Sequence, residues 1–157
     1  MAPNVWALGR AEVEQALRNG TLTRVDASRD LAEAMLQQAR GAFSAAEMVT
    51  DVSVESAFNL LYDAARLALS AVLVNQGLKT RGEGAHAAVV DLVIAQTEPP
   101  RQEAFRAVKW MRSVRNDTQY PNPDRPVASR DDFDDAVRHV PTVIERAGML
   151  VQHMPPF

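Results

Sequence analysis

The sequence contains no cysteine, which excludes disulfide bonds, cysteine-ligated zinc sites and thiol catalysis. Its three histidines, His86, His139 and His153, lack the spacing of a metal-binding motif, so we expect neither a metal nor a cofactor. No apolar run approaches the roughly 20 residues of a membrane span, and the first residues lack the basic start and apolar run of a signal peptide. We therefore expect a cytoplasmic protein without membrane contact.

The composition is that of one domain with a proper core. The chain has 157 residues, of which 46% are hydrophobic and 24% are charged, and a chain of this size can bury a substantial apolar core. The formal net charge of −3 neither favours nor excludes nucleic acid. Any site for an anion must therefore arise from a local cluster of charges.

Helical periodicity dominates the sequence, and strand signals are nearly absent. Apolar residues recur at steps of three and four, and serines that favour helix starts precede several of these segments. Helices are predicted at residues 10–18, 28–49, 53–76, 85–96, 102–119 and 129–153, and Pro141 should kink or split the last one near Val140. We expect an all-α fold, in which residues 1–27 form an N-terminal segment with a short helix. Residues 28–157 would form an up-and-down bundle of four to five main helices.

The predicted helix at residues 53–76 is apolar almost all round, which is typical of a central helix packed on several sides. A narrow polar stripe on it comprises Asn59, Asp63, Arg66 and Ser70. The stripe has two interpretations. It is a solvated edge of the helix, or Asp63 or Asn59 faces Arg115 across a helix pair.

Arg115 occupies an unusual position on the predicted helix at residues 102–119. It falls within the apolar arc formed by Ala104, Ala107, Val108, Met111 and Val114. A guanidinium cannot lose its charge, so in an apolar seam it needs a carboxylate, a phosphate or a subunit boundary. Five cations and one acid, Glu103, lie between positions 101 and 115. This basic run is interpreted either as a solvated face or as a phosphate-binding surface that includes Lys109 and Arg112.

Several short segments resemble the HEPN family of helical-bundle proteins from about Ser28 to the end of the chain. The segments are Tyr62-Asp63-Ala64-Ala65, Asn75-Gln76-Gly77-Leu78, His86-Ala87-Ala88-Val89 and Arg115-Asn116. The resemblance implies a homodimer in which the signature helices of two subunits meet. Many members are metal-independent RNases of toxin–antitoxin or defence systems, and others are non-catalytic partners of nucleotidyltransferases.

The chain departs from the family's Arg-x4-6-His signature because Tyr120 stands where the histidine is expected. The resemblance implies that Arg115 stabilises the charge on the attacked phosphate and that Asn116 orients it. With a pKa of about 10, Tyr120 is ionised only on the order of 0.1% at pH 7 and is a poor base. Its hydroxyl could still bind a phosphate, or its ring stack on a base. His86 could substitute from another helix, although nothing in the sequence places it nearby.

Two functions therefore stay open from the sequence. The first is a dimeric protein that binds RNA or a nucleotide at Arg115, Asn116 and Tyr120, and that acts as a metal-independent endoribonuclease if a base is present. The second is a non-catalytic toxin, antitoxin or interaction module that partners a nucleotidyltransferase. In this second case, Arg115 would pair with an acid such as Asp63 within the dimer.

Overall fold

The computed structural model describes residues 5–97, 103–120, 123–124 and 127–157. The predicted all-α fold is confirmed, with only one small sheet. Arg101 and the predicted helix start at Gln102 lie outside the described residues. The elements are α1 (Arg10–Arg18), β1 (Leu22–Arg24), α2 (Arg29–Val49), α3 (Val54–Gln76), β2 (Leu78–Thr80), α4 (Ala85–Thr97), α5 (Glu103–Gln119) and α6 (Arg130–His153).

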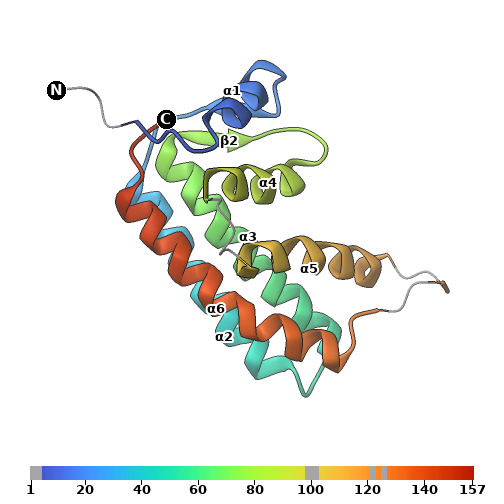
Figure 1. Cartoon of the computed structure of the whole chain (residues 1–157). Helices are drawn as coiled ribbons and strands as arrows, with labels where there is room; N and C mark the ends of the chain where they lie inside the picture. Colours follow the sequence, from blue (N-terminus) through green and yellow to red (C-terminus); the bar gives the residue numbers. More distant parts are fainter. Residues whose placement is uncertain (1–4, 98–102, 121–122, 125–126) are drawn as a thin grey trace.

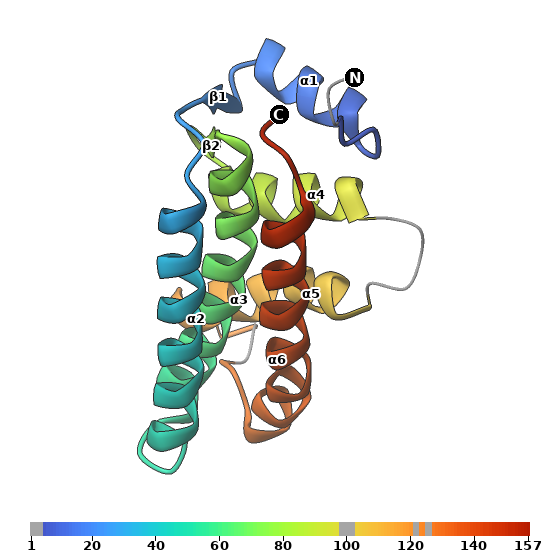
Figure 2. The same cartoon turned by 90° about the vertical axis from the view of Figure 1, so that its left-hand side faces the viewer.

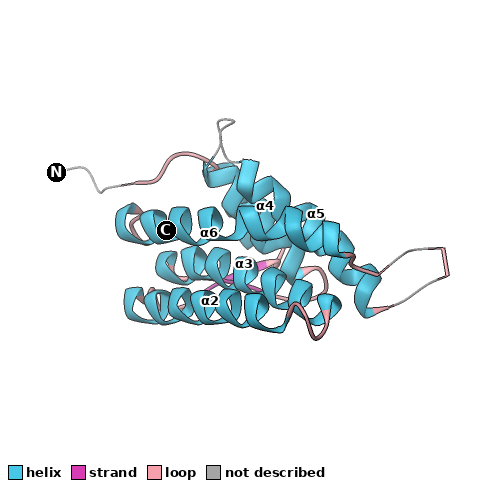
Figure 3. Ribbon diagram, turned by 90° about the horizontal axis from the view of Figure 1, so that it is seen from below, coloured by secondary structure: helices cyan, strands magenta, loops and turns pink. Residues whose placement is uncertain are grey.

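The three long helices α2, α3 and α6 lie side by side, with α3 in the middle, as the views in Figures 2 and 3 show. Helices α4 and α5 do not continue this parallel arrangement. They cross α3 steeply and lie next to each other on one side of it (Figure 1). The bundle is therefore a three-helix layer with two shorter helices laid across its central member.

The helix starts agree with the serine caps expected from the sequence. The side chains of Ser28, Ser53 and Ser129 accept hydrogen bonds from backbone N–H groups in the first turns of α2, α3 and α6. The last helix was predicted to kink or split near Val140; it does not split, because α6 runs unbroken through Pro141. Pro141 is exposed, so water can satisfy the carbonyl group that loses its intrahelical hydrogen bond.

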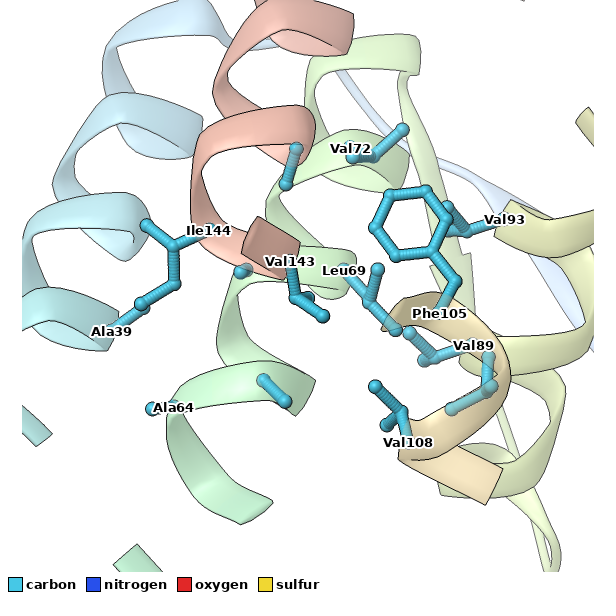
Figure 4. Close-up of a cluster of buried hydrophobic side chains, with 14 of the residues drawn as sticks. Ala39, Ala64, Leu69, Val72, Val89, Val93, Phe105, Val108, Val143 and Ile144 are labelled. Carbon is cyan, nitrogen blue, oxygen red and sulfur yellow. The ribbon is translucent and has the colours of Figure 1, made fainter. Parts of the chain in front are cut away.

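The core lies where the two layers meet. Figure 4 shows side chains from α3 and α6, among them Leu69 and Val143, meeting Val89 of α4 and Phe105 of α5, while Ala39 of α2 lies beside Ile144 of α6. Alanines on α3 have no exposed surface, and their small size lets neighbouring helices approach closely. These residues are Ala57, Ala64, Ala65, Ala68 and Ala71.

Helix α3 corrects the expectation that no segment approaches a membrane span. Its 23 residues include an 18-residue window with a mean hydropathy of 1.4, which is long and apolar enough to cross a membrane by composition. However, 61% of that window is buried inside the protein. Its apolar character follows from its central place, because α2, α4, α5 and α6 all pack against it.

A two-stranded antiparallel sheet, which the sequence analysis did not predict, connects the N-terminal segment to the bundle. Leu22 pairs with Thr80, and Arg24 pairs with Leu78. Gly77 ends α3 with a φ of 78°, and a Cβ atom there would lie 2.8 Å from the carbonyl oxygen of Val25. Glycine therefore allows the chain to turn directly from α3 into β2. The division at residue 27 stays a prediction.

Candidate functional site

A cavity of about 350 Å³ opens where the middle of α3, the start of α4 and the end of α5 meet. In Figure 1 the first turn of α4 and the last turns of α5 lie on the same side of α3. The cavity is lined by Tyr62, Gly82, Gly84, Ala85, His86, Ala87, Arg112, Arg115 and Asn116. It is therefore lined by residues of three helices and by two glycines of the loop before α4.

Two contacts fix the helices around this cavity. The Nζ atom of Lys109 on α5 lies 2.9 Å from Oδ1 of Asp91 on α4, which holds the two helices together outside the cavity. The ring of Trp110 on α5 meets that of Phe58 on α3 edge to face, with centroids 6.0 Å apart. Both contacts lie beside the end of α5 that lines the cavity.

Arg115 lies half-buried in the cavity wall, as its place in the apolar arc led us to expect. Its Cζ atom lies 5.5 Å from the centroid of the Tyr62 ring, and this cation–π contact compensates part of the charge burial. No described carboxylate forms an ion pair with Arg115. Within one chain Asp63 pairs instead with Arg66, one helical turn away, at a distance of 3.8 Å.

Two residues that line this cavity, Tyr62 and Arg115, have buried side-chain atoms without a hydrogen-bond partner. Across the described residues such atoms are Oδ1 of Asn59, the hydroxyl of Tyr62, and the Nε atoms of Arg66 and Arg115. Buried polar groups are nearly always hydrogen-bonded in proteins, and each unpaired one costs about 1–3 kcal/mol. Tyr62 on α3 and Arg115 on α5 therefore place unpaired donors at the wall of the cavity.

Burial also controls the protonation of Tyr62, which has no exposed surface. Removal from water raises the pKa of its hydroxyl, while the positive charges of Arg66, Arg115 and Arg112 oppose this rise. The hydroxyl therefore stays neutral at pH 7. A neutral hydroxyl without a partner can donate a hydrogen bond to an anion in the cavity.

His86 stands in the first turn of α4, on the cavity wall. Burial lowers the pKa of its imidazole below the usual 6.5, and the nearby charges of Arg66 and Arg115 lower it further, while Asp63 acts in the opposite sense. A helix N-terminus disfavours a cation in the same way. The imidazole is therefore mostly neutral at pH 7 and able to accept a proton.

The structure brings together some of the residues predicted from the sequence. Arg112, Arg115 and Asn116 line the cavity. Lys109 lies outside it in its ion pair with Asp91. Tyr120, at the end of α5, is 76% exposed and is not among the lining residues of the same chain.

Sequence reasoning did not place Tyr62, His86 or the loop glycines at this site. The available signal was the glycine-rich loop directly before a helix with a histidine in its first turn. This signal is weak, because the loop lacks the spacing of a known phosphate-binding motif. Across the part of the chain that the structure describes, no three His, Asp or Glu side chains gather as metal ligands.

A family model described as the HEPN domain matches residues 32–150, a range that runs from the start of α2 into α6. The chain belongs to the HEPN family. No curated protein and no solved structure matches it. Membership confirms the resemblance noted in the sequence and indicates a nucleotide-binding or RNase-like module. The interpretation of Tyr120 as the replacement of the signature histidine stays a prediction.

Proposed function

We propose that this HEPN protein binds RNA or a nucleotide by holding a phosphate group in the cavity between α3, α4 and α5. The observation that carries the proposal is the group of buried polar atoms without partners around Tyr62 and Arg115. Folding has already removed these atoms from water without giving them a hydrogen bond. A ligand with several acceptor oxygens would satisfy the donors among them.

The residues around the cavity suit a phosphate. Arg112 and Arg115 line it, and guanidinium groups bind phosphate oxygens through paired N–H donors. The first turn of α4 adds backbone N–H groups and the positive end of the helix dipole. The hydroxyl of Tyr62 and the side-chain amide of Asn116 can donate the remaining hydrogen bonds. A single small anion from the solvent would bind such a site weakly, whereas a polyanion would contact the protein at several positions and bind more tightly.

The proposal includes a homodimer, on the basis of the family resemblance. In this arrangement the basic faces of two α5 helices come together and strengthen the local positive field, which favours a polyanion such as RNA. Tyr120 has an exposed ring just beyond Asn116. It is therefore accessible to an RNA base, on which it can stack, or to the second subunit.

A binding experiment with Arg115→Ala tests the proposal. We expect the variant to bind a fluorescently labelled single-stranded RNA about 10–100-fold more weakly than wild type, because a charge-assisted hydrogen bond contributes about 1.5–3 kcal/mol. Fluorescence anisotropy in buffer with EDTA measures the affinity without metal ions. Arg115→Lys should bind with intermediate affinity, because lysine keeps the charge but loses the paired donors.

Arg138→Ala is a matched control for this experiment. Arg138 is a surface residue of α6 that pairs with Asp135, so its loss removes the same charge away from the cavity. Its affinity should stay within about twofold of wild type, since a distant exposed charge contributes little at physiological salt. Equal binding by wild type and Arg115→Ala, or binding by neither, would refute the site.

The second function left open by the sequence, a non-catalytic module that partners a nucleotidyltransferase, gives a different outcome. In that case wild type and Arg115→Ala would both fail to bind RNA. Arg115→Ala would instead weaken association with a nucleotidyltransferase, and this can be measured by size-exclusion chromatography of the mixed proteins.

A further inference from the structure

We propose that His86 is the proton acceptor of an RNA-cleaving reaction at this cavity, so that α4 supplies the base that the signature places at position 120. The inference rests on the proposed function and extends it from phosphate binding to catalysis. It also narrows the substrate class to RNA, because the reaction requires a ribose 2′-hydroxyl.

The position of His86 carries this inference. It lines the same cavity as Arg115 and Asn116, whereas Tyr120 is exposed and stands outside the lining of that cavity. His139 and His153 lie on α6, and neither lines this cavity. A substrate phosphate bound to Arg115 would therefore have an imidazole beside it, although α5 itself contains no histidine.

No hydrogen bond or ion pair with the described residues explains the position of His86. The imidazole makes no hydrogen bond or ion pair with the described residues, and it is exposed at the mouth of the cavity. A histidine held in a helix by packing would be buried or bonded. Helices α4 and α5 pack against each other, which places the first turn of α4 and the arginines of α5 on the same cavity.

The charges around His86 suit a base that works near pH 7. The groups that face it are Asp63, Arg66 and Tyr62 from α3, and Arg112 and Arg115 from α5. Partial desolvation at the cavity wall and the arginines lower the pKa of the imidazole below 6.5. A bound phosphate would partly neutralise the arginines and raise this pKa again, toward the range in which a general base is most effective.

The reaction balances without an added reactant. A ring nitrogen of His86 takes the proton of the 2′-hydroxyl, and the 2′-oxygen forms a bond to the adjacent phosphorus. The bond between phosphorus and the 5′-oxygen breaks, and the 5′-oxygen takes a proton from water. The products are a 2′,3′-cyclic phosphate and a free 5′-hydroxyl, and His86 then releases its proton to solvent. Arg115 stabilises the negative charge that develops on the phosphorane.

His86→Ala separates this step from binding. We expect wild type to cleave a labelled RNA in EDTA and to leave a 2′,3′-cyclic phosphate. His86→Ala should bind the RNA with an affinity within about twofold, yet cleave it about 10²–10⁴-fold more slowly, which is the usual contribution of a general base. Imidazole added to the buffer should restore part of the activity, because position 86 opens to solvent.

Two controls distinguish a base from a structural residue. His153→Ala removes an exposed histidine of α6 and should cleave at the wild-type rate. An RNA with 2′-O-methyl groups should bind wild type but resist cleavage. The rate of wild type should fall at acid pH, as the pH drops through the lowered pKa of His86 and the imidazole becomes protonated.

The outcomes separate the two proposals. Cleavage by His86→Ala at the wild-type rate would overturn the role of His86 and leave the binding site intact. RNA binding by wild type without any cleavage would do the same. Failure of wild type to bind RNA would overturn the proposed function, and the role of His86 with it.

Discussion

Buried polar side chains near the C-terminal end of α3 are hydrogen-bonded, whereas those in the middle of the helix have unpaired atoms. Near the C-terminal end, the amide of Asn75 donates to the carbonyl oxygen of Met154 at 3.0 Å. Gln76 and Gln96 exchange two hydrogen bonds of 2.6 and 3.1 Å. In the middle of the helix, Tyr62 and Arg66 keep buried atoms without any partner.

This difference separates a structural site from a binding site on one helix. Burying a polar group costs free energy unless a partner replaces the lost water. At the end of α3 the fold itself supplies the partners, so the bonds hold α4 and the chain after α6 in place. In the middle the fold supplies no partner for the Tyr62 hydroxyl or for Nε of Arg66, and Tyr62 lines the cavity. Burial alone does not distinguish the two cases, whereas the bonding of the buried atoms does.

The largest stability effect is expected at the paired end of α3. Gln76→Leu removes both hydrogen bonds to Gln96 and leaves the buried amide of Gln96 without this partner. We expect the free energy of unfolding to fall by about 1–3 kcal/mol, the cost of an unsatisfied buried group. Urea unfolding followed by far-UV circular dichroism measures it. The double variant with Gln96→Leu should recover part of the loss, and a neutral single variant would break the comparison.

Tyr62→Phe makes the corresponding change in the middle of α3, with a smaller and opposite effect. The variant removes a buried hydroxyl that has no partner, so the free energy of unfolding should stay constant or rise by up to about 1 kcal/mol. RNA affinity should fall about 3–10-fold, because a neutral hydrogen bond to the ligand is lost. The same urea series and RNA titration apply. A loss of stability as large as that of Gln76→Leu would show that the hydroxyl is already bonded.

The smallest effect concerns the pH dependence of stability. The pKa of His86 is lower in the folded protein than the 6.5 of the unfolded chain. Above 6.5 the imidazole is neutral in both states, and below it the unfolded chain takes up a proton first, so the folded state loses stability. His86→Gln should lack this contribution. The difference in urea midpoint between variant and wild type should therefore change in favour of the variant when the pH falls from about 8 to about 5. A shift in favour of wild type would contradict the lowered pKa.

The sequence predicted the helices well because their signals are local. The short helix at Arg10–Arg18 has the predicted bounds, and the serine caps of α2, α3 and α6 act as expected. The sheet was not predicted, because each strand has only three residues and is too short to show an alternating pattern. The crossing of α4 and α5 over α3 arises from packing between helices, and no periodicity within one helix encodes it.

The candidate site was predictable only where its residues share one helix. Arg112, Arg115 and Asn116 lie within a single turn or so of α5, so their common face follows from helical geometry. His86 and Tyr62 reach the same cavity from two other helices, and their distance from Arg115 depends on the tertiary fold. Tyr120 was chosen by its spacing from Arg115, but the helix ends at Gln119, and Tyr120 is exposed and does not line the cavity.

The buried, unpaired atoms in the middle of α3 also link ligand binding to folding. The unfolded chain hydrates those atoms freely, so any molecule that satisfies them recognises the native conformation alone. The empty protein consequently withstands heat less well than the occupied one. The melting temperature of the protein therefore reports on ligand binding, even before any reaction is known.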